Sequence, residues 1–83
     1  MASKISYKAS VVGDLKRLDK PVARRVLEKL ERALTDNPNA GVPLTGEFRG
    51  LFKLRVGDYR VIYTKTLAGP LVLRIGHRKE VYR

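Results

Sequence analysis

Cationic side chains are concentrated in the second half of this 83-residue chain. Residues 49–83 contain nine Lys and Arg against two Asp and Glu, whereas residues 1–48 contain nine against six. Such an asymmetry suits a polyanion, because neutralising phosphates releases counterions and speeds association. The charge alone is also consistent with simple solubility or with an acidic protein partner. Four of these cations recur within apolar stretches: Lys53, Arg55, Arg60 and Arg74.

The last eight residues, GHRKEVYR, are rich in side chains that can do chemistry. They contain the single histidine of the chain, two arginines, a lysine and a tyrosine. When the 2′-hydroxyl of RNA attacks the adjacent phosphate, negative charge develops on oxygens that Lys and Arg can stabilise. A tyrosine can stack on a base or share a proton. These residue types therefore fit cleavage of RNA without a metal ion.

Other kinds of chemistry have little support in the sequence. The chain has no cysteine, and its acids and single histidine show no metal-ligand spacing. No Ser/His/Asp set is spaced suggestively, and no glycine-rich stretch fits a phosphate-binding fingerprint. We therefore expect no metal and no cofactor. Because the N-terminus lacks an apolar run, we expect a cytoplasmic protein without a membrane partner.

The first half of the chain predicts a strand and two helices. Residues 4–10 alternate like a short strand, and a helix capped by Ser10 follows, with Val12, Leu15 and Leu18 as its apolar side. Residues 19–38 give the clearest helix, because apolar residues recur every four positions from Val22 to Leu34. The short connection predicts an antiparallel helical hairpin. Residues 40–50 are rich in glycine and predict a loop with at most a short extended piece.

The second half predicts a three-stranded antiparallel meander over residues 51–56, 59–65 and 71–77, separated by turn signals. Alternation places Lys53, Arg55, Arg60 and Arg74 on the face away from the helices. In the third strand it places Leu73 on the apolar face, together with Leu71 and Ile75. The expected architecture is a single α+β domain over residues 1–83 with helices on one side of the sheet.

Two long stretches carry a family resemblance: PLTGEFRGLFKLRVGDYRVIYTK and the closing RIGHRKEVYR. Together with the order of elements, they resemble the RelE/ParE superfamily of toxins from toxin–antitoxin pairs, on the RelE side. The resemblance implies a RelE-like fold and a toxin that enters the ribosomal A site and cleaves the messenger RNA there. It also implies a cognate antitoxin, and binding of operator DNA only as the toxin–antitoxin complex.

The resemblance also implies roles for individual residues. Lys53 and Arg55 would contact the scissile phosphate, Arg60 would stabilise its developing charge, Arg78 would assist the leaving oxygen and Tyr82 would orient a base. Since a guanidinium is a poor base, proton abstraction would fall to Lys53 or to His77. Some relatives have a glutamate just before the Pro-Leu pair, where this chain has Val42. Further RNA contacts are expected from three cations: Arg49, Arg74 and Lys79.

Two other functions remain open from the sequence. A ParE-like toxin shares the fold and inhibits DNA gyrase by binding, without ribonuclease activity. A nontoxic remnant or basic adaptor would use the cationic surface only to bind protein. The conjunction of Lys53, Arg55, Arg60, Arg78 and Tyr82 favours the ribonuclease, because a gyrase binder has no evident need for it.

Overall fold

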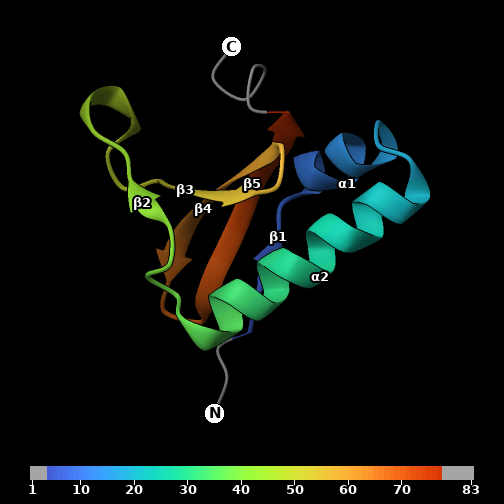
Figure 1. Ribbon diagram of the computed structural model, residues 1–83. Helices are drawn as coiled ribbons and strands as arrows, with labels where there is room; N and C mark the ends of the chain where they lie inside the picture. Colours follow the sequence, from blue (N-terminus) through green and yellow to red (C-terminus); the bar gives the residue numbers. More distant parts are fainter. Residues whose placement is uncertain (1–3, 78–83) are drawn as a thin grey trace.

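The computed structural model describes residues 4–77. Its five-stranded sheet has the order β1-β5-β4-β3-β2, in which β1 runs parallel to β5 and the other neighbours are antiparallel (Figure 1). The α+β fold and the predicted meander are confirmed, and β2 is the short extended piece of the glycine-rich loop. The elements are β1 (Ser6–Tyr7), α1 (Ala9–Lys16), α2 (Lys20–Asp36), β2 (Val42–Pro43), the 3₁₀ turn η1 (Gly46–Phe48), β3 (Phe52–Val56), β4 (Tyr59–Thr66) and β5 (Gly69–His77).

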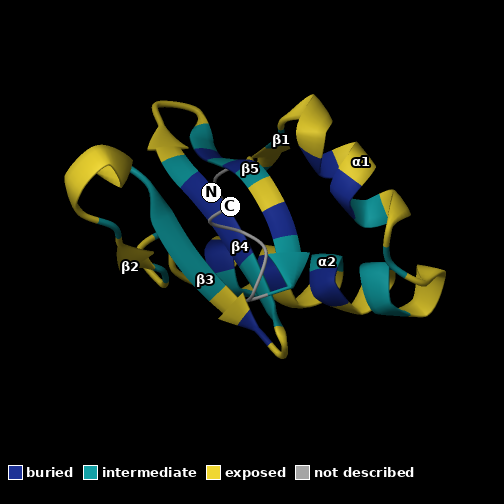
Figure 2. Ribbon diagram, turned by 90° about the horizontal axis from the view of Figure 1, so that it is seen from above, coloured by how far each residue is buried: buried dark blue, intermediate teal, exposed yellow. Residues whose placement is uncertain are grey.

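The long helix α2 covers one face of the sheet. Pro21 lies in its first turn, where a missing N–H costs nothing. Val26, Leu30 and Leu34 follow at four-residue spacing and are all buried, as the apolar periodicity predicts. They pack with Val61 and Tyr63 of the central strand. Figure 2 shows the buried residues concentrated in β4 and β5 and on the helices beside them.

The short helix α1 differs from its prediction in two respects. It begins at Ala9, so Ser10 lies inside the helix rather than at its cap. Val11 is buried, whereas Val12 is 54% exposed. Val11, Leu15 and Leu18 are spaced four and three residues apart, which keeps them on one side of a helix, and Val12 is turned about 100° away from Val11. The prediction is therefore confirmed for Leu15, which packs against the core, and wrong for Val12, whose place is taken by Val11.

Strand β5 contains a bulge that the alternating pattern did not predict. Ile62 pairs with Arg74 but Tyr63 pairs with Val72, so Leu73 is the additional residue between the two pairs. Val72 therefore enters the core beside Tyr63, and Leu73 is excluded from it. The prediction that Leu71 and Leu73 share the core face with Ile75 is wrong, because one extra residue reverses the alternation on one side of the bulge.

The Tyr63 side chain of β4 is hydrogen-bonded to the loop that follows α2. Its hydroxyl donates to the Pro38 carbonyl and accepts the Gly41 N–H, both at 2.9 Å. Burial raises the pKa of Tyr63, and the Gly41 hydrogen bond opposes that rise. A side chain at Gly41 has no room, since its Cβ would lie 2.7 Å from the Tyr63 ring.

Candidate functional site

Three of the predicted cations lie together on the face of the sheet that the helices leave open. Arg55 pairs with Arg60 across β3 and β4, and Lys53 lies two residues before Arg55 on the same face. Their strand neighbours Phe52, Leu54 and Val56 point the other way, into the helix-covered core. We call Lys53, Arg55 and Arg60 the basic face. Cross-strand pairing thus brings the three cations close together without a loop.

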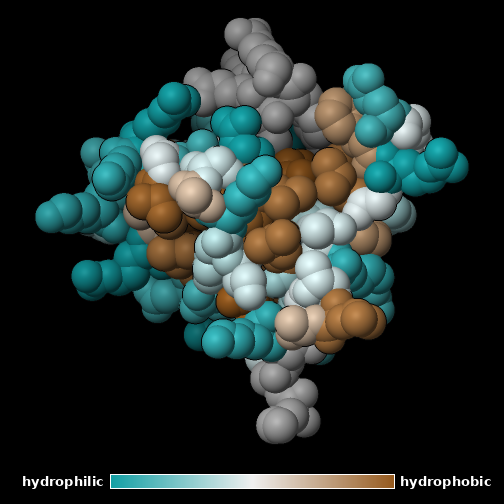
Figure 3. Space-filling view, turned by 180° about the vertical axis from the view of Figure 1, so that it is seen from behind, coloured by the Kyte–Doolittle hydropathy of each residue, from teal (hydrophilic) through white to brown (hydrophobic). Residues whose placement is uncertain are grey.

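The apolar residue Ile62 lies between Lys53 and Arg74 on the same face of the sheet. Ile62 pairs with Lys53 on one side and with Arg74 on the other, and only 5% of it is exposed although it lies outside the main core cluster. Long cationic side chains bury their methylene stems along such a residue while their charged ends stay in water. Figure 3 shows this side of the molecule, with hydrophobic surface in the middle and hydrophilic side chains around it.

Arg74 lies on the same face but has an acidic partner. Its Nε and Nη2 donate to the Asp14 carboxylate of α1, at 3.1 Å and 3.4 Å. Its guanidinium is therefore directed to the edge of the sheet where α1 lies. Register places Arg74 in line with Lys53 across Ile62, so the prediction of a shared face holds, but its charge is already paired.

Among the other predicted residues that the structure describes, His77 does not lie on the basic face. His77 shares the opposite face with Tyr59, with ring centroids 5.9 Å apart in an edge-on arrangement. The sheet therefore separates its imidazole from Lys53. Arg49 is exposed in the turn after η1. Three further residues lie outside the described residues: Arg78, Lys79 and Tyr82.

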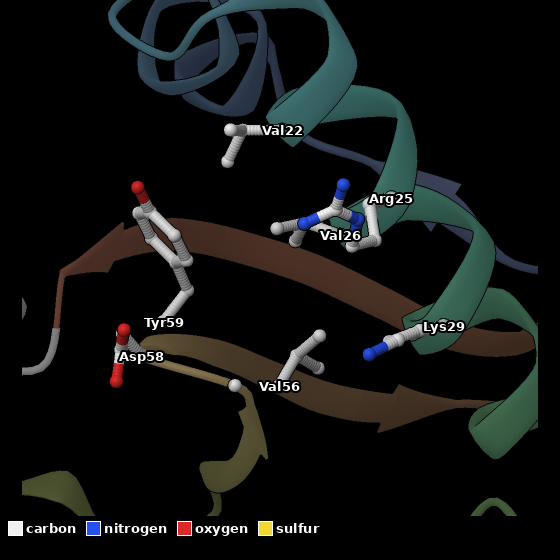
Figure 4. Close-up of a pocket in the computed structure, with 8 residues that line it drawn as sticks. Val22, Arg25, Val26, Lys29, Val56, Asp58 and Tyr59 are labelled. Atoms are coloured by element: carbon white, nitrogen blue, oxygen red, sulfur yellow. The ribbon is translucent and has the colours of Figure 1, made fainter.

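A cavity of about 310 Å³ lies between α2 and the β3–β4 turn (Figure 4). Its floor is apolar and its rim carries two cations and one acid. It opens on the helix-covered side of the sheet, and none of the predicted site residues lines it. The labelled residues around it are Val22, Arg25, Val26, Lys29, Val56, Asp58 and Tyr59.

The structure adds residues that sequence reasoning missed. Ser10 and Asp14 of α1 both bond to β5: Ser10 Oγ donates to the Leu73 carbonyl, and Asp14 accepts the Ile75 N–H. The sequence signal for Asp14 was an aspartate on the apolar side of a short helix, which needs a partner when buried.

Residues 4–77 contain acidic residues and one histidine but no cysteine. Within that range no three His, Cys, Asp or Glu side chains gather as a metal site would require. None of the helices described there is long and apolar enough to cross a membrane.

The fold matches that of small RelE-like toxins. Residues 5–82 match the family described as the ParE toxin of the type II toxin–antitoxin system parDE. The chain belongs to this family, within the RelE/ParE superfamily that its motifs predict.

Known relatives agree with this assignment. Toxin RelE of Mycobacterium tuberculosis (strain ATCC 25618 / H37Rv) is 37% identical over 60 residues, which are 71% of this chain and 62% of the relative. The match thus spans less than two thirds of that relative's length. The toxin–antitoxin complex RelBE2 of M. tuberculosis contains a chain that superposes with a TM-score of 0.85, at 27% identity over 94% of this chain and all of the other. A chain of the archaeal RelE–RelB complex of Pyrococcus horikoshii OT3 gives 0.71, at 28% identity over 98% of this chain and all of the other.

Proposed function

We propose that this toxin is a ribosome-dependent endoribonuclease that cleaves messenger RNA in the ribosomal A site without a metal ion and so inhibits translation. The observation that carries the proposal is the basic face, in which three cations from two adjacent strands converge on one side of the sheet. The similarity to Toxin RelE supports the same function.

The proposed reaction uses the 2′-hydroxyl of the message as nucleophile. Its oxygen bonds to the adjacent phosphorus as the bond to the 5′-oxygen breaks. The 2′-hydroxyl proton passes to the Lys53 amine and the departing 5′-oxygen takes a proton from water, which leaves a 2′,3′-cyclic phosphate and a 5′-hydroxyl. Arg55 and Arg60 stabilise the phosphorane oxygens, because guanidinium groups stay charged and pair with phosphate in fixed geometry. Lys53 carries the amine that can exchange a proton, and it lies beside Arg55. Arg78 and Tyr82 keep the roles that the family resemblance implies.

We further propose a cognate antitoxin as the physiological partner. The similar M. tuberculosis and P. horikoshii chains were each solved in a toxin–antitoxin complex. A protein with a formal net charge of +10 offers strong electrostatic attraction to an acidic partner. We expect operator DNA to be bound only by the toxin–antitoxin complex, because the antitoxin can supply the element that reads the DNA.

Inhibition of DNA gyrase is the rival function, and the match to the ParE family is the observation that favours it. The two functions are separated by inducing the toxin in growing cells and mapping the 5′ ends of transcripts by primer extension. The ribonuclease proposal predicts new ends inside translated regions while purified gyrase keeps its supercoiling activity. Intact transcripts together with DNA damage would contradict it. Growth arrest relieved by the neighbouring gene's product distinguishes either toxin from a nontoxic adaptor.

A further inference from the structure

Asp14 is the one buried charged residue among those the structure describes. It is 8% exposed and lies in α1, far along the sequence from the basic strands. Its carboxylate accepts three hydrogen bonds: from Arg74 Nε, from Arg74 Nη2 and, at 2.9 Å, from the backbone N–H of Ile75. A carboxylate is costly to bury unless it is paired in this way.

Part of what Asp14 does is to complete the edge of the sheet. β1 pairs with β5 only at Leu71 and Val72. Beyond that point the outer edge of β5 is bonded by side chains of α1, with Ser10 on the Leu73 carbonyl and Asp14 on the Ile75 N–H. An unpaired strand edge is otherwise open to other chains. An amide oxygen would accept the Ile75 N–H equally well, so edge completion does not explain the negative charge.

The negative charge acts on Arg74. Register places Arg74 beside Ile62, which pairs with Lys53, so Arg74 would extend the basic face by a fourth cation. The Arg74 side chain remains 46% exposed, yet its guanidinium is held against Asp14 by two N–H groups. A guanidinium already paired with a carboxylate has little net charge to offer a phosphate.

We propose that Asp14 is a positioning residue that withdraws Arg74 from the basic face and so limits the affinity of the toxin for RNA outside the ribosome. The inference rests on the proposed function, since it concerns RNA bound at that face. Each phosphate that a protein neutralises strengthens binding to any sequence and steepens its dependence on salt. With Arg74 engaged, off-ribosome RNA has one cation fewer to contact on this face of the sheet, and binding that does not lead to cleavage is kept weak.

The test measures binding of a fluorescent single-stranded RNA by anisotropy over a range of salt concentrations. Asp14→Asn keeps an oxygen for the Ile75 N–H and releases Arg74. It should tighten binding by about fivefold to tenfold at 50 mM salt, and it should steepen the slope of log K against log salt by about 0.7, the value for one further phosphate on a single strand. The double variant Asp14→Asn/Arg74→Gln should have the same slope of log K against log salt as the single variant Arg74→Gln.

Asp36→Asn is the matched control, because it makes the same change in net charge at an exposed position in the last turn of α2. It should change affinity by less than about twofold and leave the slope unaltered, since one remote charge neutralises no phosphate directly. An equal gain from Asp36→Asn would overturn the inference, as would an unchanged slope for folded Asp14→Asn.

A second comparison holds even if Asp14→Asn fails to fold. Arg74→Gln and Arg55→Gln remove the same charge from exposed positions on one face. Arg74→Gln should lower the salt slope by less than half as much as Arg55→Gln, and an equal or larger loss would overturn the inference. If the wild-type protein shows no salt-dependent RNA binding, the proposed function itself fails. If it binds and only the Asp14 and Arg74 results differ from these, the inference alone fails.

Discussion

At the scale of single residues, the two candidates for the general base lie on opposite faces of the sheet. Lys53 lies on the basic face beside Arg55, whereas His77 lies on the opposite face against Tyr59. A general base must come within hydrogen-bonding distance of the proton it removes. The sequence left both residues open, because they were chosen as groups that can accept a proton where a guanidinium cannot, and not by their position on the sheet.

Lys53→Ala should therefore lower the rate of cleavage of ribosome-bound message by about 10² to 10³-fold, since it removes the amine that accepts the 2′-hydroxyl proton and, once protonated, stabilises the phosphorane as a cation. His77→Ala should change the rate by less than about fivefold, because the residue acts from the wrong side of the sheet. Primer extension on purified ribosomes measures both rates. Lys65→Ala is the matched control, a lysine of β4 whose ammonium lies over the Phe52 ring on the other face. The reverse ranking would assign proton abstraction to His77.

At the scale of elements, two glycines illustrate how the fold holds the basic strands. Gly41 allows the loop before β2 to pass against Tyr63 and the Lys53 carbonyl, whereas nothing lies within 4 Å of a Cβ at Gly13 in α1. Gly41→Ala should lower the free energy of unfolding by about 1 to 3 kcal/mol through overpacking. Gly13→Ala should raise it by about 0.5 to 1 kcal/mol, because alanine is the better helix former.

Thermal unfolding followed by circular dichroism checks this pair. For a domain of this size 1 kcal/mol corresponds to a shift in Tm of about 4 to 8 °C, so the two substitutions should shift Tm in opposite directions. Since both substitutions replace glycine with alanine, the difference between their Tm shifts reflects how much space surrounds the added Cβ at each position. If Gly41→Ala melted at or above the wild-type temperature, the close passage of the loop over Tyr63 would be wrong.

Contact between β1 and α2 gives a dependence of stability on pH. Tyr7 donates to Glu31, and burial, together with that carboxylate, raises its pKa above the ordinary value of 10.0. As pH rises past about 10, the unfolded chain loses this proton while the folded chain keeps it, so the free energy of unfolding falls. The contribution is present in full below pH 10 and declines above it.

Tyr7→Phe should be less stable than the wild type at pH 8, because the hydrogen bond is lost, but its stability should fall less steeply between pH 10 and 11. Urea unfolding at a series of pH values gives both slopes. Glu31→Gln serves as the partner variant and should also flatten the decline, since it removes the negative charge that helps to raise the pKa of Tyr7. Identical slopes in all three proteins would show that the Tyr7 proton is not linked to folding.

The elements also show what a sequence can and cannot predict. Four-residue spacing in α2 is a local pattern that predicted which side chains are buried. Two-residue alternation in β3 is also local, and it predicted which side chains pack against the core. The bulge at Leu73 depends on how β5 pairs with β4, which alternation within one strand does not contain. The role of Asp14 depends on a contact with Arg74 across 60 positions of sequence. The local pattern indicates that Asp14 needs a partner but not which residue provides it.

At the scale of the whole molecule, the fold divides charge between two surfaces. One side of the sheet is covered by α2, whose outer surface mixes Lys and Arg with Glu, while the other side presents Lys53, Arg55 and Arg60 together. A formal net charge of +10 alone would attract RNA to any part of the protein. We propose that position on the sheet, rather than total charge, makes the toxin a ribonuclease.

The most direct measurement compares two triple variants of equal net charge. One replaces Lys53, Arg55 and Arg60 by alanine, and the other replaces Arg24, Arg25 and Lys29 of α2. Cleavage of ribosome-bound message is followed by primer extension, with circular dichroism to establish that both variants fold. The basic-face variant should lose at least about 10³-fold in rate, as expected when several groups that stabilise the transition state are removed, and the α2 variant should stay within about tenfold of the wild type. Equal losses in the two variants, or cleavage by the basic-face variant at the wild-type rate, would contradict the account.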